Sequence, residues 1–532
     1  MRSGKPDGRS RRRFVQAIAA LGSAGLLGKA RATQARAGSP PQVLSGPQLN
    51  LTVTQVAVTV AGRSCMATAV NGSVPGPILR LCEGDDAVIA VTNRLSQPTS
   101  IHWHGLRLPS DQDGVPGLSF RGIEPGTTFT YRFPVRQSGT YWYHSHSGVQ
   151  EQTGLYGAII IAPRAAAPVA EDREHVLLLS DWTCEDPMTV LSNLKQQSDY
   201  YNQRRSTVTT LAVRAMWSRM RMDPADISDV SGATYTFLAN GHAPTANTTL
   251  RYEPGERVRL RVINGSSMTT FDVRIPGLSV QVVAADGNEV APVSVDELRI
   301  GVAETYDLIV APKDAGAYTI FAQAQDRSGY ARATLATRAG VSTDIPAMDP
   351  RPLRSTADMR GAMQGMNMAG MNMPGMSADS MMPNRLAEAG DGLQNNGRRV
   401  LTYADLQAAT GVEEIVASRD ITLHLTGNME RFVWGFDGEK FSQAQPIPVK
   451  LGERVRFVLI NDTMMEHPIH LHGFFFALEN AQARLPRKHT INVKPASRVS
   501  FLVHADTPGC WAFHCHLLYH MEAGMFRTVV VA

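Results

Sequence analysis

Histidines carry the clearest chemical signal in this sequence of 532 residues. Ten of the 15 histidines fall in four short clusters, at 102–104, 144–146, 467–472 and 514–520, and each cluster contains a His-x-His pair. Residues i and i+2 of a β-strand point to the same face, so each pair would project two imidazoles side by side. Neutral imidazole is a common metal ligand. If the four pairs converge, they supply eight nitrogens, enough for three metal ions with positions left open for oxygen.

A second candidate site combines Cys515 with His467, His520 and Met525. Cys515 lies in the middle of the last His-x-His pair, so its side chain points to the opposite face of the strand. His467 has the opposite parity to the two histidines that follow it, and so it can face away from them. Two histidines, a thiolate and a weak methionine ligand are typical of a blue-copper electron-transfer site. Such a site would place a one-electron acceptor one peptide bond from His514 and His516.

Two motifs that recur three times predict how these residues are positioned. The first is a Gly turn followed by alternating apolar residues, at Glu83–Asn93, Pro254–Asn264 and Leu451–Asn461. The second occupies Gly139–His146, Gly316–Gln323 and Gly509–His516. Alternation with period two is typical of half-buried strands. The repeat therefore predicts three related β-sandwich domains, over about residues 45–165, 170–340 and 400–532.

The repeat also relates the histidines to one another. His102 and His470 each lie nine residues after the closing Asn of the first motif, and the other pairs share the second motif. The second unit has no ligand in the matching positions, which hold Val273, Ile275, Phe321 and Gln323. We therefore expect the metal ions between units one and three, with unit two purely structural.

Two segments lack the strand pattern. Residues 190–228 are predicted to form a helical insertion in the second unit. Residues 341–399 are predicted to link units two and three. Their stretch 359–382 is predicted to be an exposed, mobile loop, because Gly and Pro break any helix there. The stretch 359–382 of this linker contains nine methionines, namely Met359, Met363, Met366, Met368, Met371, Met373, Met376, Met381 and Met382. Thioethers prefer Cu(I), which favours copper handling over a linker of accidental composition or a sacrificial oxidant trap.

Residues 1–37 have the three parts of an export signal. Ser10-Arg11-Arg12-Arg13 precedes a weakly apolar stretch at 17–28, and Ala-x-Ala sites follow at 30–32 and 35–37. The paired arginines resemble the twin-arginine (Tat) signal, which predicts a periplasmic protein. This segment holds nine basic residues and one acidic residue, so the rest of the chain has a net charge of −4. That charge gives no reason to expect nucleic acid as a partner. The sequence contains no apolar run of about 18 residues, so we expect no membrane span.

The chain has five cysteines, an odd number, so at least one cannot be in a disulfide within the chain. Cys515 is the cysteine with another role. Cys65 and Cys82 can pair in an oxidising compartment or remain two buried thiols, and the sequence favours neither. Cys184 and Cys510 have no assigned partner.

Three stretches resemble the multicopper oxidase family, and in particular bacterial copper-resistance oxidases of the CopA/PcoA type. They are Arg219–Pro224, Leu423–Arg431 and His514–Met525, and the resemblance covers essentially the whole mature chain. It implies a mainly β fold of three consecutive cupredoxin-like Greek-key β-sandwiches, and four copper ions. By motif, the type 1 copper is held by His467, Cys515, His520 and Met525, and the type 2 copper by His102 and His470. The type 3 pair is held by His104, His144, His146, His472, His514 and His516.

The resemblance also implies acids near the oxygen site. Asp113 resembles the family's acid beside the cluster, although an ordinary turn Asp is the alternative. Relatives often carry an acid directly after the last type 1 histidine, but this chain has Met521 there. Glu522 and Glu151 are both open candidates for a second proton donor. The remaining histidines have no ligand spacing and are expected to be solvated or satisfied in the core: His175, His242, His424, His489 and His504.

The leading hypothesis is a periplasmic oxidase that couples one-electron oxidation of Cu(I) to reduction of O2 to water. A laccase that oxidises phenols is the first alternative, and a broad, open, apolar pocket at the type 1 site would favour it. A non-catalytic copper-sequestering protein is the second alternative. The expected partners are O2 and Cu(I) or small organic reductants, together with other periplasmic copper-handling proteins. We expect a monomer.

Overall fold

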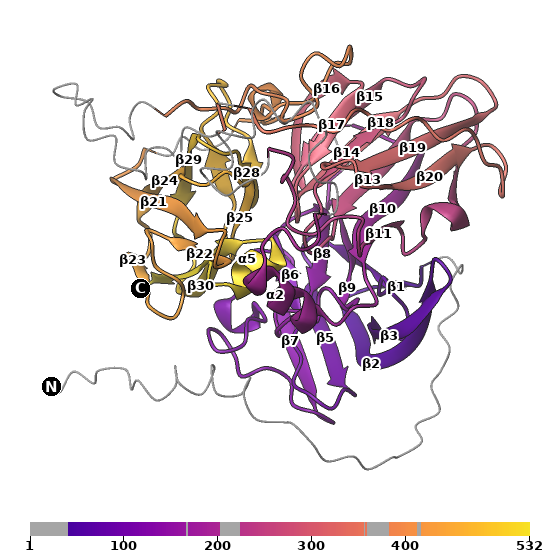
Figure 1. The fold of residues 1–532 in the computed structure, drawn as a ribbon. Coiled ribbons are helices and arrows are strands. Elements are labelled where there is room, and N and C mark those ends of the chain that lie inside the picture. Colours follow the sequence, from indigo (N-terminus) through magenta and orange to yellow (C-terminus); the bar gives the residue numbers. More distant parts are fainter. Residues whose placement is uncertain (1–40, 166–168, 203–223, 356, 359–381, 412–415) are drawn as a thin grey trace, which may run out of the picture.

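The computed structural model describes residues 41–532 except 166–168, 203–223, 356, 359–381 and 412–415 (Figure 1). Six sheets in the described residues form three consecutive β-sandwiches. Residues 1–37 and eight of the nine methionines of the stretch 359–382 lie outside the described residues, whereas Met382 lies within them. None of the described helices is long and apolar enough to cross a membrane.

The first sandwich packs a four-stranded sheet on a five-stranded one around a shared apolar core. The smaller sheet has the order β3 (Arg63–Val70), β2 (Gln48–Val60), β5 (Asp86–Asn93) and β7 (Thr128–Pro134). The larger sheet has the order β1 (Val43–Ser45), β4 (Ile78–Cys82), β9 (Tyr156–Ala162), β8 (Gly139–His144) and β6 (His102–His104). A short 3-10 helix, η1 (Ser110–Gln112), follows β6.

The second sandwich has a six-stranded and a five-stranded sheet. The first has the order β11 (Thr236–Ala239), β10 (Arg173–Trp182), β13 (Val258–Asn264), β18 (Thr305–Val310), β15 (Val280–Ala285) and β16 (Asn288–Val295). The other has the order β12 (Thr248–Arg251), β20 (Tyr330–Ala336), β19 (Ala317–Ala324), β14 (Phe271–Arg274) and β17 (Glu297–Ile300). Helix α2 (Pro187–Gln196) and the 3-10 helix η3 (Pro244–Ala246) lie in its connections.

The third sandwich repeats this plan. Its six-stranded sheet has the order β22 (Val433–Phe436), β21 (Arg419–Asn428), β24 (Arg454–Asn461), β29 (Arg498–His504), β26 (Phe476–Leu478) and β27 (Arg487–Lys488). Its five-stranded sheet has the order β23 (Ile447–Val449), β31 (Phe526–Val531), β30 (Gly509–Cys515), β25 (His467–Leu471) and β28 (Thr490–Val493). The 3-10 helix η5 (Tyr403–Asp405) precedes it, and helix α5 (Leu518–Glu522) follows β30.

The first sequence motif forms the same strand in all three sandwiches. β5, β13 and β24 each pair in parallel with an earlier strand and antiparallel with a later one. The second motif forms β8, β19 and β30. Each of these strands pairs antiparallel with the strand that follows it in the chain.

A buried Asn ends each copy of the first motif. The side-chain amides of Asn93, Asn264 and Asn461 each donate to two backbone carbonyls across the loop that follows. Each side-chain oxygen also accepts the backbone N–H two residues later. These bonds satisfy buried polar backbone groups and fix the loop that leads into β6, β14 or β25. In the first and third units, that strand carries a His-x-His pair.

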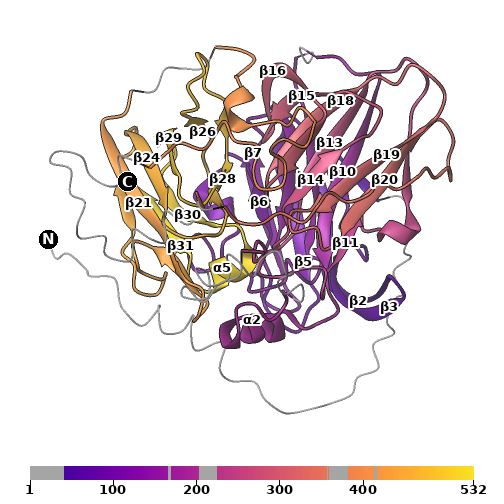
Figure 2. The same ribbon diagram turned by 45° about the horizontal axis from the view of Figure 1, so that its top comes forward.

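Within the described residues, the predicted helical insertion contains one helix, α2. Helix α2 begins after Asp186, whose side chain caps the Thr189 N–H at 2.9 Å, and it buries Val190, Leu191 and Leu194. Residues 224–231 are irregular, and 203–223 lie outside the described residues. Helix α2 lies beside α5 in both views (Figures 1 and 2). The insertion therefore borders the end of the chain that carries His520.

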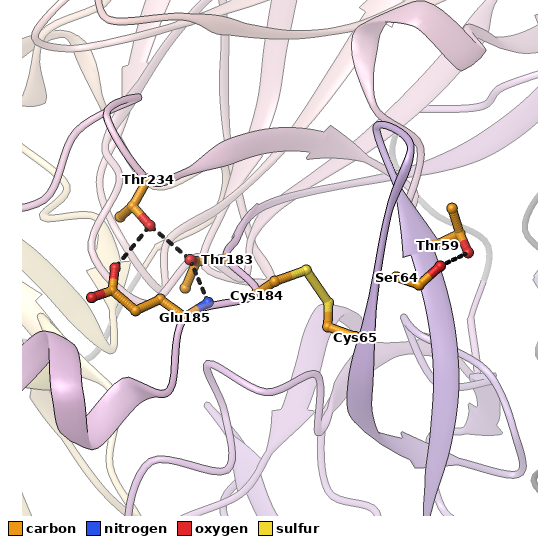
Figure 3. The surroundings of a disulfide bond; sticks show 7 residues. All are labelled: Thr59, Ser64, Cys65, Thr183, Cys184, Glu185 and Thr234. Carbon is orange, nitrogen blue, oxygen red and sulfur yellow. Dashed lines mark hydrogen bonds between the residues drawn. A yellow bond between two sulfur atoms is a disulfide. The ribbon is translucent and has the colours of Figure 1, made fainter.

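One disulfide joins Cys65 to Cys184, which corrects the possible Cys65–Cys82 pair (Figure 3). Cys65 lies on β3, in the hairpin that reaches toward the second sandwich, and its Cα is 5.6 Å from that of Cys184. Cys82 ends β4 in the opposite sheet of the first sandwich and is an exposed free thiol. The disulfide therefore ties the first sandwich to the start of α2.

Candidate metal centre

The four His-x-His pairs meet between the first and third sandwiches. In the first, β6 pairs with β8 and sets His102 opposite His144, and in the third, β25 pairs with β30 and sets His470 opposite His514. The rings then alternate across the interface. His102 stacks on His472, and His104 on His470, each with ring centroids 3.9 Å apart. The matching strands of the repeat thus place ligand-bearing residues from both ends of the chain face to face.

His102 and His470 direct one nitrogen each into this interface. Their Nδ1 atoms lie 2.8 Å from the Asp113 carbonyl oxygen and 2.7 Å from the His489 carbonyl oxygen. A carbonyl accepts only, so Nδ1 carries the proton and Nε2 holds the lone pair. Both Nε2 atoms are buried and have no hydrogen-bond partner among the described residues.

The other six histidines form two groups of three, each with its nitrogens within 4.8 Å of one another. The groups are His104 with His144 and His516, and His146 with His472 and His514. Nε2 of His516 lies 3.3 Å from Nε2 of His144, and Nε2 of His472 lies 3.1 Å from Nε2 of His514. Nδ1 of His144, His472 and His514 lies within hydrogen-bond distance of an oxygen acceptor, so Nε2 of these rings keeps its lone pair. Nε2 atoms this close suit a shared cation.

Burial keeps these imidazoles neutral. It lowers the pKa of His104, His144, His146, His470, His472 and His516 well below the usual value, and that of His514 to about 4. Each ring therefore offers a lone pair instead of a second proton.

Cys515 forms a separate group on the other face of β30. Its Sγ lies 3.6 Å from Nδ1 of His467 and 3.8 Å from Nδ1 of His520, and these two nitrogens are 3.2 Å apart. Met525 is fully buried, and its carbonyl accepts the Cys515 N–H at 3.1 Å. The Trp434 ring stacks on His520 at 4.0 Å. Burial raises the pKa of the Cys515 thiol, so a cation is needed to hold it as a thiolate.

Both histidines of this group have their second nitrogen bonded. His467 Nε2 lies 2.7 Å from the Thr463 hydroxyl, and His520 Nε2 lies 2.7 Å from Asp229 Oδ2. Asp229 comes from the irregular segment after α2, where no sequence periodicity marked it. Nδ1 of both rings is therefore directed at Cys515.

Two buried acids contact the histidine groups. Asp113 Oδ2 accepts from Nδ1 of His472 at 2.8 Å, and Glu151 Oε2 lies 2.6 Å from Nδ1 of His144. The other oxygen of Glu151 is buried without a hydrogen-bond partner among the described residues. Glu522 lies instead on α5, where the charge that acts on it is that of Lys195 on α2. Of the two open candidates, Glu151 is the one placed beside the cluster.

His489 differs from its expected role. Its ring centroid lies 4.7 Å from that of His104 and 5.4 Å from that of His470, and its carbonyl orients His470. No ligand spacing could have revealed this, because the contact comes from the pairing of β25 with β28. His175 and His242 bond to backbone carbonyls, and His424 bonds to Asp462. His504 is partly buried at the end of β29.

The matching positions of the second unit hold core residues. Val273, Ile275 and Phe321 are buried among apolar side chains, except that Arg274 lies over the Phe321 ring. The Gln323 side chain bonds to Asp349 through both its amide and its carbonyl.

A small cavity of about 10 Å³ adjoins the Cys515 group. Its lining includes Asp229, Met268, Gln325, Met465 and Glu466. The free oxygen of Asp229 and the Gln325 amide nitrogen are buried without hydrogen-bond partners among the described residues. A cavity of this size holds about one water molecule or one ion.

Comparison with known proteins places these groups in a family context. Multicopper oxidase family models match residues 52–166, 173–340 and 415–532. The chain is 49% identical to the copper resistance protein A homolog of Pseudomonas syringae pv. tomato, over 99% of this chain and 100% of that protein. It is also 49% identical to copper resistance protein A of Escherichia coli, over 98% and 99%.

The fold is similar to that of a multicopper oxidase from Pseudomonas thermotolerans, with a TM-score of 0.61 and 23% identity, over 92% of this chain and 100% of that one. The predicted fold class, three cupredoxin-like β-sandwiches, is therefore confirmed.

Proposed function

Since the chain belongs to the multicopper oxidase family, we propose that it is an exported oxidase of copper resistance that takes electrons from Cu(I) and reduces O2 to water. The single observation that supports this most strongly is the convergence of eight histidines between two sandwiches, with Cys515 on the strand that carries two of them. A laccase and a copper-sequestering protein would share parts of this site.

The donor set fits copper. Imidazole nitrogens suit Cu(II), and a thiolate with two imidazoles and a distant thioether suits an electron-transfer copper. The nitrogens that face the interior are buried and unpartnered, or face one another, which is costly unless a cation is bound between them. We assign His467, Cys515, His520 and Met525 to the type 1 copper and His102 and His470 to the type 2 copper. The two three-histidine groups would hold the type 3 pair.

When bound, the four copper ions supply one-electron transfer and O2 reduction, so that four Cu(I), O2 and four protons give four Cu(II) and two water molecules. Cys515 contributes the connection. It is joined by single peptide bonds to His514 and His516, which belong to different three-histidine groups. Electrons accepted at the sulfur therefore have a short covalent path to both groups.

Acids of the chain orient the oxygen site. Asp113 holds a proton on Nδ1 of His472, and Glu151 holds one on Nδ1 of His144, so that Nε2 of each ring faces the interior. We propose that Asp113 is the acid near the cluster that the family resemblance implies, and that Glu151 takes the second position in place of Glu522.

The cavity beside His520 supports Cu(I) as the electron donor. Two thioethers, Met268 and Met465, and two carboxylates, Asp229 and Glu466, line it. Soft sulfur favours Cu(I), and the unpartnered oxygen of Asp229 favours a cation, whereas Glu466 is already paired with Arg299. Asp229 joins this cavity to His520 by one hydrogen bond. A phenol is several times larger than this cavity of about 10 Å³.

We further propose that residues 1–37 direct Tat export to the periplasm, that the protein works as a monomer, and that the linker 341–399 collects Cu(I). We also propose that the three domains span about residues 45–165, 170–340 and 400–532.

Oxygen uptake with Cu(I) and with a phenol tests the function. The variants are Met465→Leu, the matched control Met464→Leu, which is buried but does not line the cavity, and deletion of 359–382. We expect Met465→Leu and the deletion to lower the ratio of Cu(I) to phenol efficiency, and Met464→Leu to leave it unchanged. Equal ratios in all variants would favour a laccase. Copper binding without oxygen uptake on either substrate would favour sequestration.

A further inference from the structure

The second sandwich contributes a fully buried ion cluster to the edge of the histidine site. Asp286, in the turn between β15 and β16, and Glu304, just before β18, both face Lys488 of the third sandwich. The Lys488 ammonium lies 3.0 Å from Asp286 Oδ2 and 3.0 Å from Glu304 Oε1, and all three side chains are at most 1% exposed. Two tyrosine rings, Tyr306 and Tyr403, cover the same ammonium.

This cluster is unusual because ion pairs so deeply buried rarely stabilise a fold. Apolar side chains of similar volume would stabilise the domain interface equally well. The Asp286 carboxylate has further partners that explain it. Its Oδ2 accepts the backbone N–H of His489 at 3.2 Å and that of Thr490 at 3.1 Å, while Oδ1 accepts the Thr305 N–H at 3.1 Å.

The two backbone groups that Asp286 holds belong to residues that orient proposed copper ligands. The His489 carbonyl accepts from Nδ1 of His470 at 2.7 Å. The Thr490 hydroxyl lies 3.3 Å from Nε2 of His104 and 3.3 Å from Nδ1 of His470. These contacts leave His470 Nε2 and His104 Nδ1 as the unpartnered nitrogens that face the interior.

We propose that Asp286, fixed by Lys488 and Glu304, is a positioning residue for the type 2 copper and the adjoining type 3 ligand. The second sandwich, which has no copper ligands, thus fixes the orientation of the His470 and His104 rings through the backbone of residues 489–490. This inference rests on the proposed function, because it concerns ligands assigned there.

The chain offers a matched control in Asp307. It is also a buried acid of the second sandwich, 2% exposed, and it pairs with two arginines, Arg259 and Arg261. No hydrogen bond from a copper-ligand histidine to Asp307 is present among the described residues, and the Thr140 hydroxyl donates to its other oxygen. Loss of a buried charge at Asp307 therefore reproduces the structural damage without touching residues 489–490.

Three variants separate positioning from charge: Asp286→Ala, Asp286→Asn and the double variant Asp286→Asn/Lys488→Met. The Asn side chain can still accept from the His489 and Thr490 N–H groups, and the double variant removes both charges together. The measurements are copper affinity in titrations of the apoprotein, the electron paramagnetic resonance of type 2 copper, and the blue absorption of type 1 copper.

Asp286→Ala should weaken type 2 copper binding by about 10- to 100-fold, the range for loss of residues that orient metal ligands. The double variant should recover most of that affinity, and Asp307→Asn should keep it throughout. The blue absorption should persist in all variants, because no ligand of the Cys515 group contacts Asp286. If Asp286→Ala does not fold, the comparison of Thr490→Val with Asp307→Asn decides: Thr490→Val removes the hydroxyl that contacts His104 and His470 and should alter the type 2 resonance. Asp286→Asn keeps an acceptor for the two backbone N–H groups and should alter it little.

Unchanged type 2 affinity and resonance in folded Asp286→Ala, or in Thr490→Val if the Ala variant does not fold, would overturn the inference. An equal loss in Asp307→Asn would overturn it as well, because the effect would then be general damage. If instead the unaltered protein binds no copper at His102 and His470, the proposed function itself fails.

Discussion

Replacement of Asp229 tests whether its hydrogen bond to His520 lowers the reduction potential of the proposed type 1 copper. Asp229 accepts from His520 Nε2 at 2.7 Å, and both side chains are at most 1% exposed. A hydrogen bond to a charged group contributes about 1.5–3 kcal/mol. The carboxylate stabilises the more positive, oxidised form of the copper site more than the reduced form, so Asp229→Asn should raise the reduction potential.

The size of the rise follows from that hydrogen bond. If about 0.7–1.5 kcal/mol distinguishes the two oxidation states, the potential of a one-electron couple rises by about 30–65 mV, since 59 mV corresponds to a factor of ten. Cu(I) turnover should nevertheless fall by about tenfold, or about 1.4 kcal/mol, because the cavity loses the carboxylate that attracts the cation. The copper ligands themselves are unchanged.

A redox titration followed at the blue absorption measures the potential, and oxygen uptake with Cu(I) measures the turnover. Asp226→Asn is the matched control, because Asp226 is a buried acid three residues away that bonds to Asn202 at 2.9 Å and not to His520. A potential that stays the same or falls in Asp229→Asn would refute the electrostatic reasoning. Equal effects of the two substitutions would show that the segment, and not the hydrogen bond, matters.

Four further predictions follow from the described contacts and from the sequence. Cys515→Ser should abolish the blue absorption and most oxygen uptake while the far-ultraviolet circular dichroism stays that of the native fold, and a variant that stays blue would contradict the type 1 assignment. Cys184→Ser should destabilise the protein by at most about 5 kcal/mol, from the 119-residue separation that the disulfide closes, whereas Cys82→Ser should change stability little; denaturant unfolding measures both. Metal analysis and a copper-loaded crystal structure should find four copper ions and none at Val273 or Phe321. Replacement of six linker methionines with Leu should lower the ratio of Cu(I) to phenol efficiency while the blue absorption persists; the six are Met363, Met366, Met368, Met371, Met373 and Met376.

Much of the fold and the grouping of histidines could be predicted because both depend on local pattern. Period-two alternation marked β5, β13 and β24, and the repeat related His102 to His470 before any contact was known. Parity within a strand correctly placed Cys515 on the face opposite to its two neighbours. These inferences need only the geometry of one strand and the symmetry of a duplicated unit.

Other features could not be predicted because they arise where separate parts of the chain meet. Asp229 lies in a segment without periodicity, and its contact with His520 spans 291 residues. His489 has no ligand spacing, because β28 brings it to the site by pairing with β25. The Cys65–Cys184 disulfide depends on how the first sandwich docks on the second, which no cysteine spacing encodes.

The joining of two sandwiches in one histidine site has a consequence for how the protein assembles. His144 and His516 face each other across 372 residues of sequence, so neither sandwich can bind these ions alone. Each bridging ion then acts as a non-covalent crosslink, and its binding free energy adds to the stability of the docked arrangement. Chelation should loosen the junction between the first and third sandwiches before it unfolds either one. Metal loading in such a molecule therefore reports that both ends of the chain have been made, folded and brought together.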